Sequence, residues 1–450
     1  MSNDGRAPTG NAVEASIDQC VADAIAGSFD EYPRPLRNMV RLRAVRLGDA
    51  WLDRHDTHID VQFSLGLPAE LFPVSDGGLQ LLVDLLAGDM FPSEVDGCRW
   101  SDVTVRRIEL SGELRDAAVA TFRRPGAHDI AAIRSRFGLT AGRPLLAFSL
   151  KPRVGPTFAE IRKLTLDVLR EGFNIVELDT RNLALSTEPV ERWIELGLEA
   201  AQVGKHVTAF SPNFSVPAPR LIDVATAWVD SLDGHGPAVL KVDGGLDGLT
   251  NLQSVRTHLG SGRSPVVTSY PLLRNQLSSA VGPGGWTDLL ALSGADIVYP
   301  GGRPTFPRER RPVWGAHDKE WSRAARIYDD LISQGWPMPT IAGGVHPGHL
   351  HAFYELLGPN VAYFLGGAVA LHPGGVREGA RLCVAVLDEA ITLAAAADEA
   401  GKNWSHDLNT RLLQRIERAG YPTALVYEPP QNIFGRDRND APRTFYRRAR

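Results

Sequence analysis

The chain has 450 residues, of which 43% are hydrophobic and 22% charged, with a formal net charge of −5; these values are typical of a globular protein and argue against general binding to nucleic acid or anionic membranes. The polar N-terminus is not typical of a signal peptide, and no run of about 18 apolar residues predicts a membrane span. Cys20, Cys98 and Cys383 lack metal or redox spacing, so we expect a reducing compartment and a cytoplasmic protein.

The first third of the chain predicts a flexible arm followed by a small domain. Residues 1–35 predict the arm, and residues 36–140 predict an α+β domain of ferredoxin-like type. Apolar and polar residues alternate in "NMVRLRAVRL", "HIDVQFSLGL" and "DVTVRRIELSG", as they do in half-buried strands. The segment "GLQLLVDLLAGDMF" predicts a helix that ends near Gly88.

From residue 141 to 432, short apolar strands alternate with amphipathic helices. Eight such repeats predict a parallel (β/α)₈ TIM barrel, followed by a basic tail at 433–450. An open doubly wound sheet is the competing architecture, but it usually has fewer strands and a glycine-rich turn after the first. The predicted strands are 145–151, 174–179, 206–210, 238–243, 265–270, 296–301, 339–344 and 362–367.

In a barrel, polar residues at the C-terminal ends of the strands form the active site. Because side chains alternate across a strand, one set of polar residues faces the barrel interior. This set comprises Ser149 and Lys151, Glu177 and Asp179, and Lys241 and Asp243, with Arg153 following in the first loop.

A lysine beside two carboxylates has two interpretations, and the sequence leaves both open. One is a buried ion-pair network that stabilises the barrel. The other is an acid–base lysine near a divalent cation, Mg²⁺, bound by Glu177 and Asp179. In the second case the cation polarises a ketone or enediolate oxygen while Lys151 moves the proton.

The last two strands end in the glycine pairs Gly343–Gly344 and Gly366–Gly367. Barrels often bind phosphate after strands seven and eight, and glycine lets backbone N–H groups approach an anion closely. The three histidines of "HPGHLH" suggest zinc, but we favour loop or helix-capping roles for them.

Several segments, in the same order, resemble the large subunit of RuBisCO. "GRPLLAFSLKPRVG" is similar to the stretch around that family's strand-one lysine, and "LLAGDMF" to a segment that reaches into the partner subunit. "LSGADIVYPG", "AGGVHPGHL" and "FLGGAVALHPGG" resemble strands six to eight, and "GKNWSHDL" resembles the C-terminal helical extension. The resemblance covers about residues 40–430.

The resemblance implies roles for individual residues. Lys151 matches the proton-handling lysine, Arg153 replaces a second active-site lysine, and Asp179 matches a metal-binding carboxylate. Asp89 occupies the place of an asparagine donated by the neighbouring subunit, which implies a homodimer or a higher oligomer of dimers. The residues that the resemblance places at substrate or phosphate are Ser149, Ala342, Gly343, Gly344, His346, Gly366 and Gly367.

Departures from the family pattern imply another reaction. RuBisCO reads K-D-D-E at strand two, where the lysine becomes a metal-binding carbamate; this chain reads "ELDT", with Glu177 and Thr180 replacing the lysine and final glutamate. The second phosphate loses its usual partners, since Pro271 and Tyr299 stand in two of their places. The chain is therefore similar to RuBisCO-like proteins, the non-carboxylating form IV branch.

We therefore expect no CO₂ fixation, but an enolase- or isomerase-type proton transfer on a monophosphorylated keto-sugar or related compound. Two alternatives stay open. One is transcarboxylase- or hydrolase-type cleavage of a carbon–carbon bond in a sugar-acid phosphate, which is lyase-like chemistry. The other is a non-catalytic protein that binds a phosphorylated metabolite.

Overall fold

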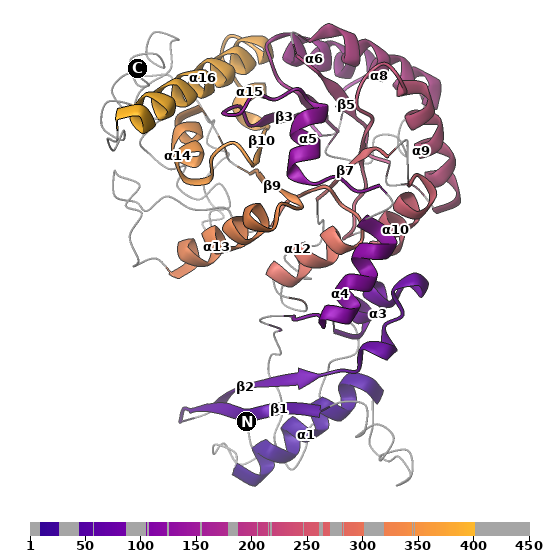
Figure 1. Ribbon diagram of the computed structural model, residues 1–450, viewed down its shortest axis with the longest axis vertical. Coiled ribbons are helices and arrows are strands. Elements are labelled where there is room, and N and C mark those ends of the chain that lie inside the picture. The colour runs from indigo at the N-terminus through magenta and orange to yellow at the C-terminus, as the bar shows by residue number, and fades with distance from the viewer. Residues whose placement is uncertain are drawn as a thin grey trace.

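The computed structural model describes residues 10–26, 45–56, 58–86, 105, 108–123, 126–153, 155–178, 188–204, 206–214, 216, 218–245, 247–260, 264–270, 281, 283–300, 319–343, 345 and 347–400. A two-stranded hairpin with one helix lies at one end of the molecule, and a ring of helices around a barrel lies at the other (Figure 1).

The N-terminal unit is an antiparallel hairpin covered by a helix. Strands β1 (Val45–Arg54) and β2 (Ile59–Gly66) pair in antiparallel register. Helix α1 (Gly10–Ala26) buries Val13 and Ile17 against the apolar face of this hairpin. Residues 10–26 therefore form a packed helix where the sequence predicted a flexible arm, because Val13 and Ile17 lie on one helical face and are buried against the hairpin.

Short helices connect the hairpin to the barrel. The predicted helix at 78–91 begins as expected at Gly78, and its α-helical part is α3 (Gly78–Asp84). The predicted strand at 102–112 lies partly outside the described residues, and its described residues 105 and 108–110 are not in a strand. The other elements are η1 (Ala69–Leu71), η2 (Val74–Asp76), α4 (Gly112–Ala118), the π-helix η4 (Val119–Arg123) and α5 (Ile130–Arg136).

Eight parallel strands form the barrel, as the sequence predicted. Their order is β5-β4-β3-β10-β9-β8-β7-β6, and a bridge between Asn213 and Lys241 joins the two outer strands. The backbone N–H of Phe214 donates to the carbonyl of Lys241 at 2.9 Å across this seam. The strands are β3 (Leu145–Ser149), β4 (Ile175–Glu177), β5 (Ala209–Ser211), β6 (Val239–Lys241), β7 (Val266–Ser269), β8 (Ile297–Val298), β9 (Met338–Ile341) and β10 (Ala362–Leu365).

Helices surround the barrel (Figure 1). Helix α6 begins after Thr157, whose side chain forms a capping box with Glu160. Within the described part of the chain, no helix combines the length and apolarity needed to cross a membrane. The helices are α6 (Phe158–Arg170), α8 (Val190–Val203), α9 (Ala218–Leu232), α10 (Leu249–His258), α12 (Pro283–Leu292), α13 (Lys319–Gln334), α14 (Pro347–Leu357), α15 (Gly367–Ala370) and α16 (Val376–Ala400).

The barrel interior is apolar at the N-terminal ends of the strands and polar at their C-terminal ends. Ile130 and Ile133 of α5, with Phe137 directly after the helix, pack against the inward side chains Leu145 and Ala147 of β3, so α5 closes the opening at the N-terminal ends of the strands. The outward residues of the same strand, Leu146 and Phe148, belong instead to the core under the helices. This alternation leaves the next inward position on each strand for the functional site.

A buried charge network stabilises the barrel at the N-terminal ends of its strands. The carboxylate of Asp296, which precedes β8, is bound by the guanidinium of Arg256 and accepts the N–H groups of His128 at 2.6 Å and Val267 at 2.8 Å. Burial lowers the pKa of His128, whose Nε2 lies 3.1 Å from the carbonyl of Ser264. Since these groups tie β7, β8 and α10 together, they hold the strands that form one side of the site.

Candidate active site

A cavity of about 170 Å³ opens at the C-terminal ends of the barrel strands, where the sequence placed the site. A cavity of about 150 Å³ holds one benzene ring, so this one admits the reacting part of a small metabolite whose remainder extends to the opening. Its lining residues are Ser149, Lys151, Arg153, Glu177, Lys241, Thr268, Ser269, Tyr270, Ile297, Val298, Tyr299, Thr340, Ala342, Gly343, Val345, Phe364, Gly366, Gly367 and Ala368.

At one wall of the cavity, three polar side chains form a buried network. The Nζ of Lys241 lies 2.7 Å from Oε1 of Glu177, and the hydroxyl of Thr268 donates to Oε2 of Glu177 at 2.7 Å. The side chains of Lys241 and Glu177 are only 2% and 5% exposed. Both carboxylate oxygens thus have a donor, and the negative charge is balanced by a buried ammonium.

These three residues meet because of the barrel register. Glu177 is paired with Ser211 of β5, which separates β4 from β6. Since Ser211 is small and its side chain points inward, the longer side chains of Glu177 and Lys241 reach each other across it. The Nζ of Lys241 also lies 5.5 Å from the ring centre of Tyr270, within the range of a cation–π contact.

Lys151 lies at the end of β3, on the side of the cavity formed with β10. Its Nζ is 3.5 Å from the hydroxyl of Ser149, and a Cβ atom added to Gly366 would lie 3.3 Å from its Cε. The absence of a side chain at Gly366 therefore leaves the space that the Lys151 chain occupies. Arg153 also lines the cavity and is exposed.

The glycines after β9 and β10 form the part of the cavity wall next to Lys151. Gly343 has a φ of +80°, a conformation that favours glycine, and the hydroxyl of Tyr299 donates to the neighbouring carbonyl of Ala342 at 3.3 Å. Gly366 and Gly367 follow β10 at the start of α15. All four of the predicted residues Ala342, Gly343, Gly366 and Gly367 thus line the cavity that contains Lys151.

Four predicted site residues, Asp89, Asp179, Gly344 and His346, lie outside the described residues. Of the described ones, the structure brings Ser149, Lys151, Arg153 and Glu177 to one cavity. Glu177, however, is paired with Lys241 and not with Lys151. Glu177 thus belongs to a buried ion pair, as one of the two interpretations expected. Lys151 lines the same cavity but is not part of that pair.

The pairing of Glu177 does not fit the predicted Mg²⁺ site. The Lys241 ammonium already lies 2.7 Å from Oε1 of Glu177, so a divalent cation bound to the same carboxylate would be repelled by a neighbouring positive charge. Mg²⁺ also needs near-octahedral oxygen ligands, whereas both Glu177 oxygens already accept hydrogen bonds. The ammonium therefore occupies the electrostatic role of a cation at this carboxylate.

Lys241 and Thr268 are missing from the predicted site residues, although the sequence carried the signal for both. The strand "VLKVD" turned Lys241 inward, and the same alternation in "PVVTSY" turns Thr268 inward. What the sequence did not show is which inward residues touch, because that depends on the stagger of neighbouring strands.

Comparisons with known proteins find similarity in sequence and in fold. No family model matches the chain. The chain is 24% identical over 351 residues to a ribulose bisphosphate carboxylase large chain of Rhodopseudomonas palustris (strain BisA53), with 72% of this chain and 68% of the relative covered. A second large chain, from strain BisB5, is 23% identical over 351 residues, with the same fractions of both chains covered.

Solved structures share the fold. An octameric ribulose-1,5-bisphosphate carboxylase/oxygenase from Pyrococcus horikoshii superimposes with a TM-score of 0.66 at 18% identity, covering 92% of each chain. A dimeric archaeal Rubisco from Hyperthermus butylicus gives 0.64 at 18% identity, again covering 92% of each. The N-terminal unit and the barrel of this chain thus have counterparts along nearly the whole length of both.

Proposed function

Since the chain is a distant member of the RuBisCO large-chain family, we propose that it is an enzyme of the enolase or isomerase type. It transfers a proton next to the carbonyl of a monophosphorylated keto-sugar or related compound and fixes no CO₂. The observation that supports this most is the position of Lys151, whose amine shares one small cavity with a buried ammonium and a glycine wall.

The chemistry needs a base and a cation, and the cavity has a candidate for each. The neutral amine of Lys151 takes the proton from the carbon beside the carbonyl; the C–H electron pair forms the C=C bond, and the carbonyl π electrons move to oxygen. The ammonium of Lys241 stabilises the resulting enediolate oxygen. The hydroxyl on the deprotonated carbon passes its proton to the enediolate oxygen and becomes the new carbonyl, and the proton on Lys151 returns to the former carbonyl carbon, which completes an isomerisation.

The network around Glu177 supports a reaction without carboxylation. In the resemblance described above, residue 177 corresponds to the lysine that becomes a metal-binding carbamate, and a glutamate cannot form one. Here its carboxylate is held by Lys241 and Thr268. The proposed proton transfer therefore uses an ammonium at the position where the family uses Mg²⁺.

The substrate carries one phosphate in this proposal. Backbone N–H groups at Gly343, Gly366 and Gly367 bind it, with Arg153 supplying positive charge at the opening of the cavity. RuBisCO binds a second phosphate, and Tyr299 stands at one of the positions that do so. The Tyr299 hydroxyl donates to a carbonyl, and the side chain carries no positive charge. A monophosphate thus matches the charges of the cavity better than a bisphosphate.

We further propose a cytoplasmic homodimer, or an oligomer built from dimers, in which Asp89 reaches the partner's cavity. The dimeric and octameric states of the structural neighbours support this arrangement.

Solvent deuterium uptake tests the function. The protein is incubated in D₂O with a panel of phosphorylated ketoses and sugar acids, and ¹H NMR follows loss of the signal beside the carbonyl. Lys151→Ala should reduce the exchange rate by about 10²–10⁴-fold, the usual contribution of a general base. Lys163→Ala serves as the control, because this lysine lies on α6 with a side chain 75% exposed.

No exchange in any compound, or equal exchange in the Lys151→Ala variant, would refute the proposal. Product analysis by mass spectrometry separates isomerisation from the cleavage alternative, since cleavage yields two carbon fragments. A ligand that binds without exchange or turnover would support the non-catalytic alternative.

A further inference from the structure

The turn of the N-terminal hairpin gathers side chains that the proposed enzyme activity does not use. Residues Leu52, Ile59 and Val61 face helix α1. Because side chains alternate along a strand, Asp53 and Asp60 face the opposite side, where the ladder pairs them directly. His55 and His58 lie two residues from these aspartates, on the same side of the hairpin.

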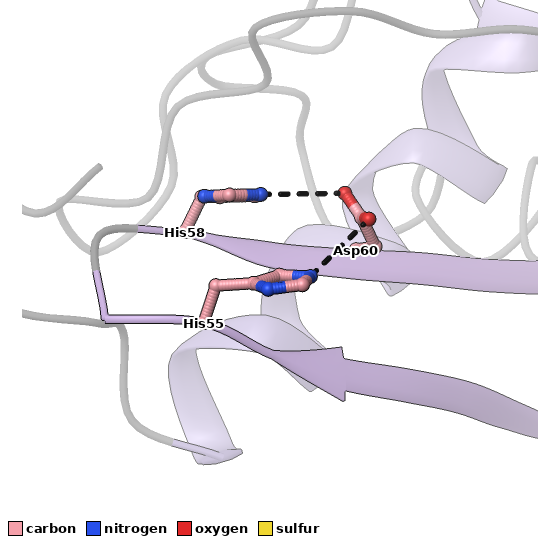
Figure 2. A group of neighbouring side chains, drawn as sticks. All are labelled: His55, His58 and Asp60. Atoms are coloured by element: carbon pink, nitrogen blue, oxygen red, sulfur yellow. Dashed lines mark ion pairs between the residues drawn. The ribbon is translucent and has the colours of Figure 1, made fainter.

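Figure 2 shows that both imidazole rings point toward one carboxylate. The Nε2 of His55 lies 3.5 Å from Oδ2 of Asp60, and the Nε2 of His58 lies 3.9 Å from Oδ1 of the same residue. The two rings are stacked, with centroids 4.3 Å apart and planes 16° from parallel. One ligand atom from each of the three residues falls within 4.8 Å of the others.

These distances match the edges of a metal coordination shell. Zinc–nitrogen and zinc–oxygen bonds of about 2.0–2.1 Å in a tetrahedron place neighbouring ligand atoms about 3.3–3.4 Å apart. The observed separations of 3.5 and 3.9 Å need only small side-chain rotations to reach this value. Asp53, whose Oδ2 lies 3.8 Å from Nε2 of His55, offers a fourth ligand.

The backbone and the local charge favour a cation here. The N–H of His55 donates to the carbonyl of His58 at 2.9 Å, which holds the two residues at fixed spacing across the hairpin. Residues 45–66 contain four aspartates and two arginines, a net charge of −2. Arg54 lies between Asp53 and His55 and alternates to the other face.

We propose that His55, His58 and Asp60 bind a zinc-class transition-metal ion at the hairpin turn, with Asp53 or water completing the shell. Two imidazoles and one or two carboxylates suit Zn²⁺, Co²⁺, Ni²⁺ or Cu²⁺, whereas Mg²⁺ and Ca²⁺ prefer oxygen ligands alone. The ion links the ends of β1 and β2. The site is separate from the barrel cavity, so it stands or falls independently of the proposed reaction.

Isothermal titration with ZnCl₂ at pH 7.5 tests the site on the full chain, purified without a histidine tag. We expect one ion per chain with a Kd below about 100 μM. The double variant His55→Asn/His58→Asn and the single variant Asp60→Asn should each weaken binding at least tenfold, because each removes first-choice ligands. His235→Asn removes an exposed histidine elsewhere and should change the Kd less than twofold.

Cobalt gives a second measurement that does not depend on the heat of binding. Co²⁺ bound in a four- or five-coordinate shell should produce visible d–d absorption in the wild type and in His235→Asn, and lose it in His55→Asn/His58→Asn. Circular dichroism verifies that the exposed substitutions leave the fold intact. Absence of saturable zinc binding with a Kd below about 100 μM, or equal affinity in the wild type and the double variant, would overturn the proposal.

Discussion

The buried pair of Glu177 and Lys241 gives the sharpest prediction about stability. Glu177→Gln keeps the shape of the side chain but removes its negative charge, so the Lys241 ammonium stays buried without a counter-ion. Removing one partner of a buried ion pair costs about 3–5 kcal/mol. The separation of 2.7 Å and the side-chain exposures of 2% and 5% place this pair in that class.

We expect a loss of about 3 kcal/mol, at the lower end of that range, because the amide oxygen still accepts one hydrogen bond. A barrel of about 290 residues has an unfolding entropy of roughly 0.6 kcal/mol/K, so each kcal/mol lowers the Tm by roughly 1.6 °C and the expected decrease is about 5 °C. Differential scanning calorimetry measures it. The matched control is Glu199→Gln, which breaks a pair with Arg162 in which both side chains are at least 40% exposed.

A double variant tests whether charge is the cause. Lys241→Met removes the ammonium, so Glu177→Gln/Lys241→Met leaves no unpaired charge, and its loss should be smaller than the sum of the single losses by 1 kcal/mol or more. A Tm loss in Glu177→Gln no larger than that in Glu199→Gln, or single effects that simply add, would refute this prediction.

Three other predictions concern the barrel scaffold. Gly197→Ala should destabilise the protein by up to about 2 kcal/mol in urea unfolding, because the added Cβ would lie 2.5 Å from the Trp228 ring. The control Gly284→Ala should leave the stability unchanged, because no atom lies within 4 Å of the added Cβ. Equal destabilisation by the two variants would contradict this prediction. Burial lowers the pKa of His128 below that of an unfolded histidine, which is about 6.5. Below about pH 6.5 the unfolded chain therefore binds more protons than the folded one. The free energy of unfolding then falls as the pH drops, by at most about 1.4 kcal/mol per pH unit. Urea titrations at pH 7.5 and 5.5 should show a smaller pH effect in His128→Gln, and an unchanged one would count against it. Burial raises the pKa of Cys383, so in a variant with Cys20 and Cys98 changed to serine, Ellman's reagent should react only after denaturation, and rapid reaction of the folded protein would disprove this.

The barrel was predictable because its strands are short apolar runs with a clear alternation. That alternation placed Lys151, Glu177 and Lys241 on the inward side, and all three line the cavity. The boundaries were less certain at the third strand, predicted at 206–210 and found at Ala209–Ser211. Strand ends depend on hydrogen bonds to neighbouring strands, which a single sequence does not specify.

The contacts inside the site were not predictable. The sequence suggested that Lys151 faces Glu177 because their strands are neighbours. The structure pairs Glu177 with Lys241 instead, since the small Ser211 leaves room across β5 and the stagger brings those two side chains to one level. Helix α1 was missed although its docking residues Val13 and Ile17 stand at helical i, i+4 spacing in a segment that contains further apolar residues.

A crystal structure of the protein grown with MgCl₂ and inorganic phosphate tests the central claim most directly. We predict the Nζ of Lys241 at about 2.7 Å from Glu177, as found here, and a phosphate on the backbone of Gly366 and Gly367 facing Lys151. A magnesium ion coordinated by Glu177 with Lys241 displaced, or a Lys151 amine directed away from the cavity, would contradict the account.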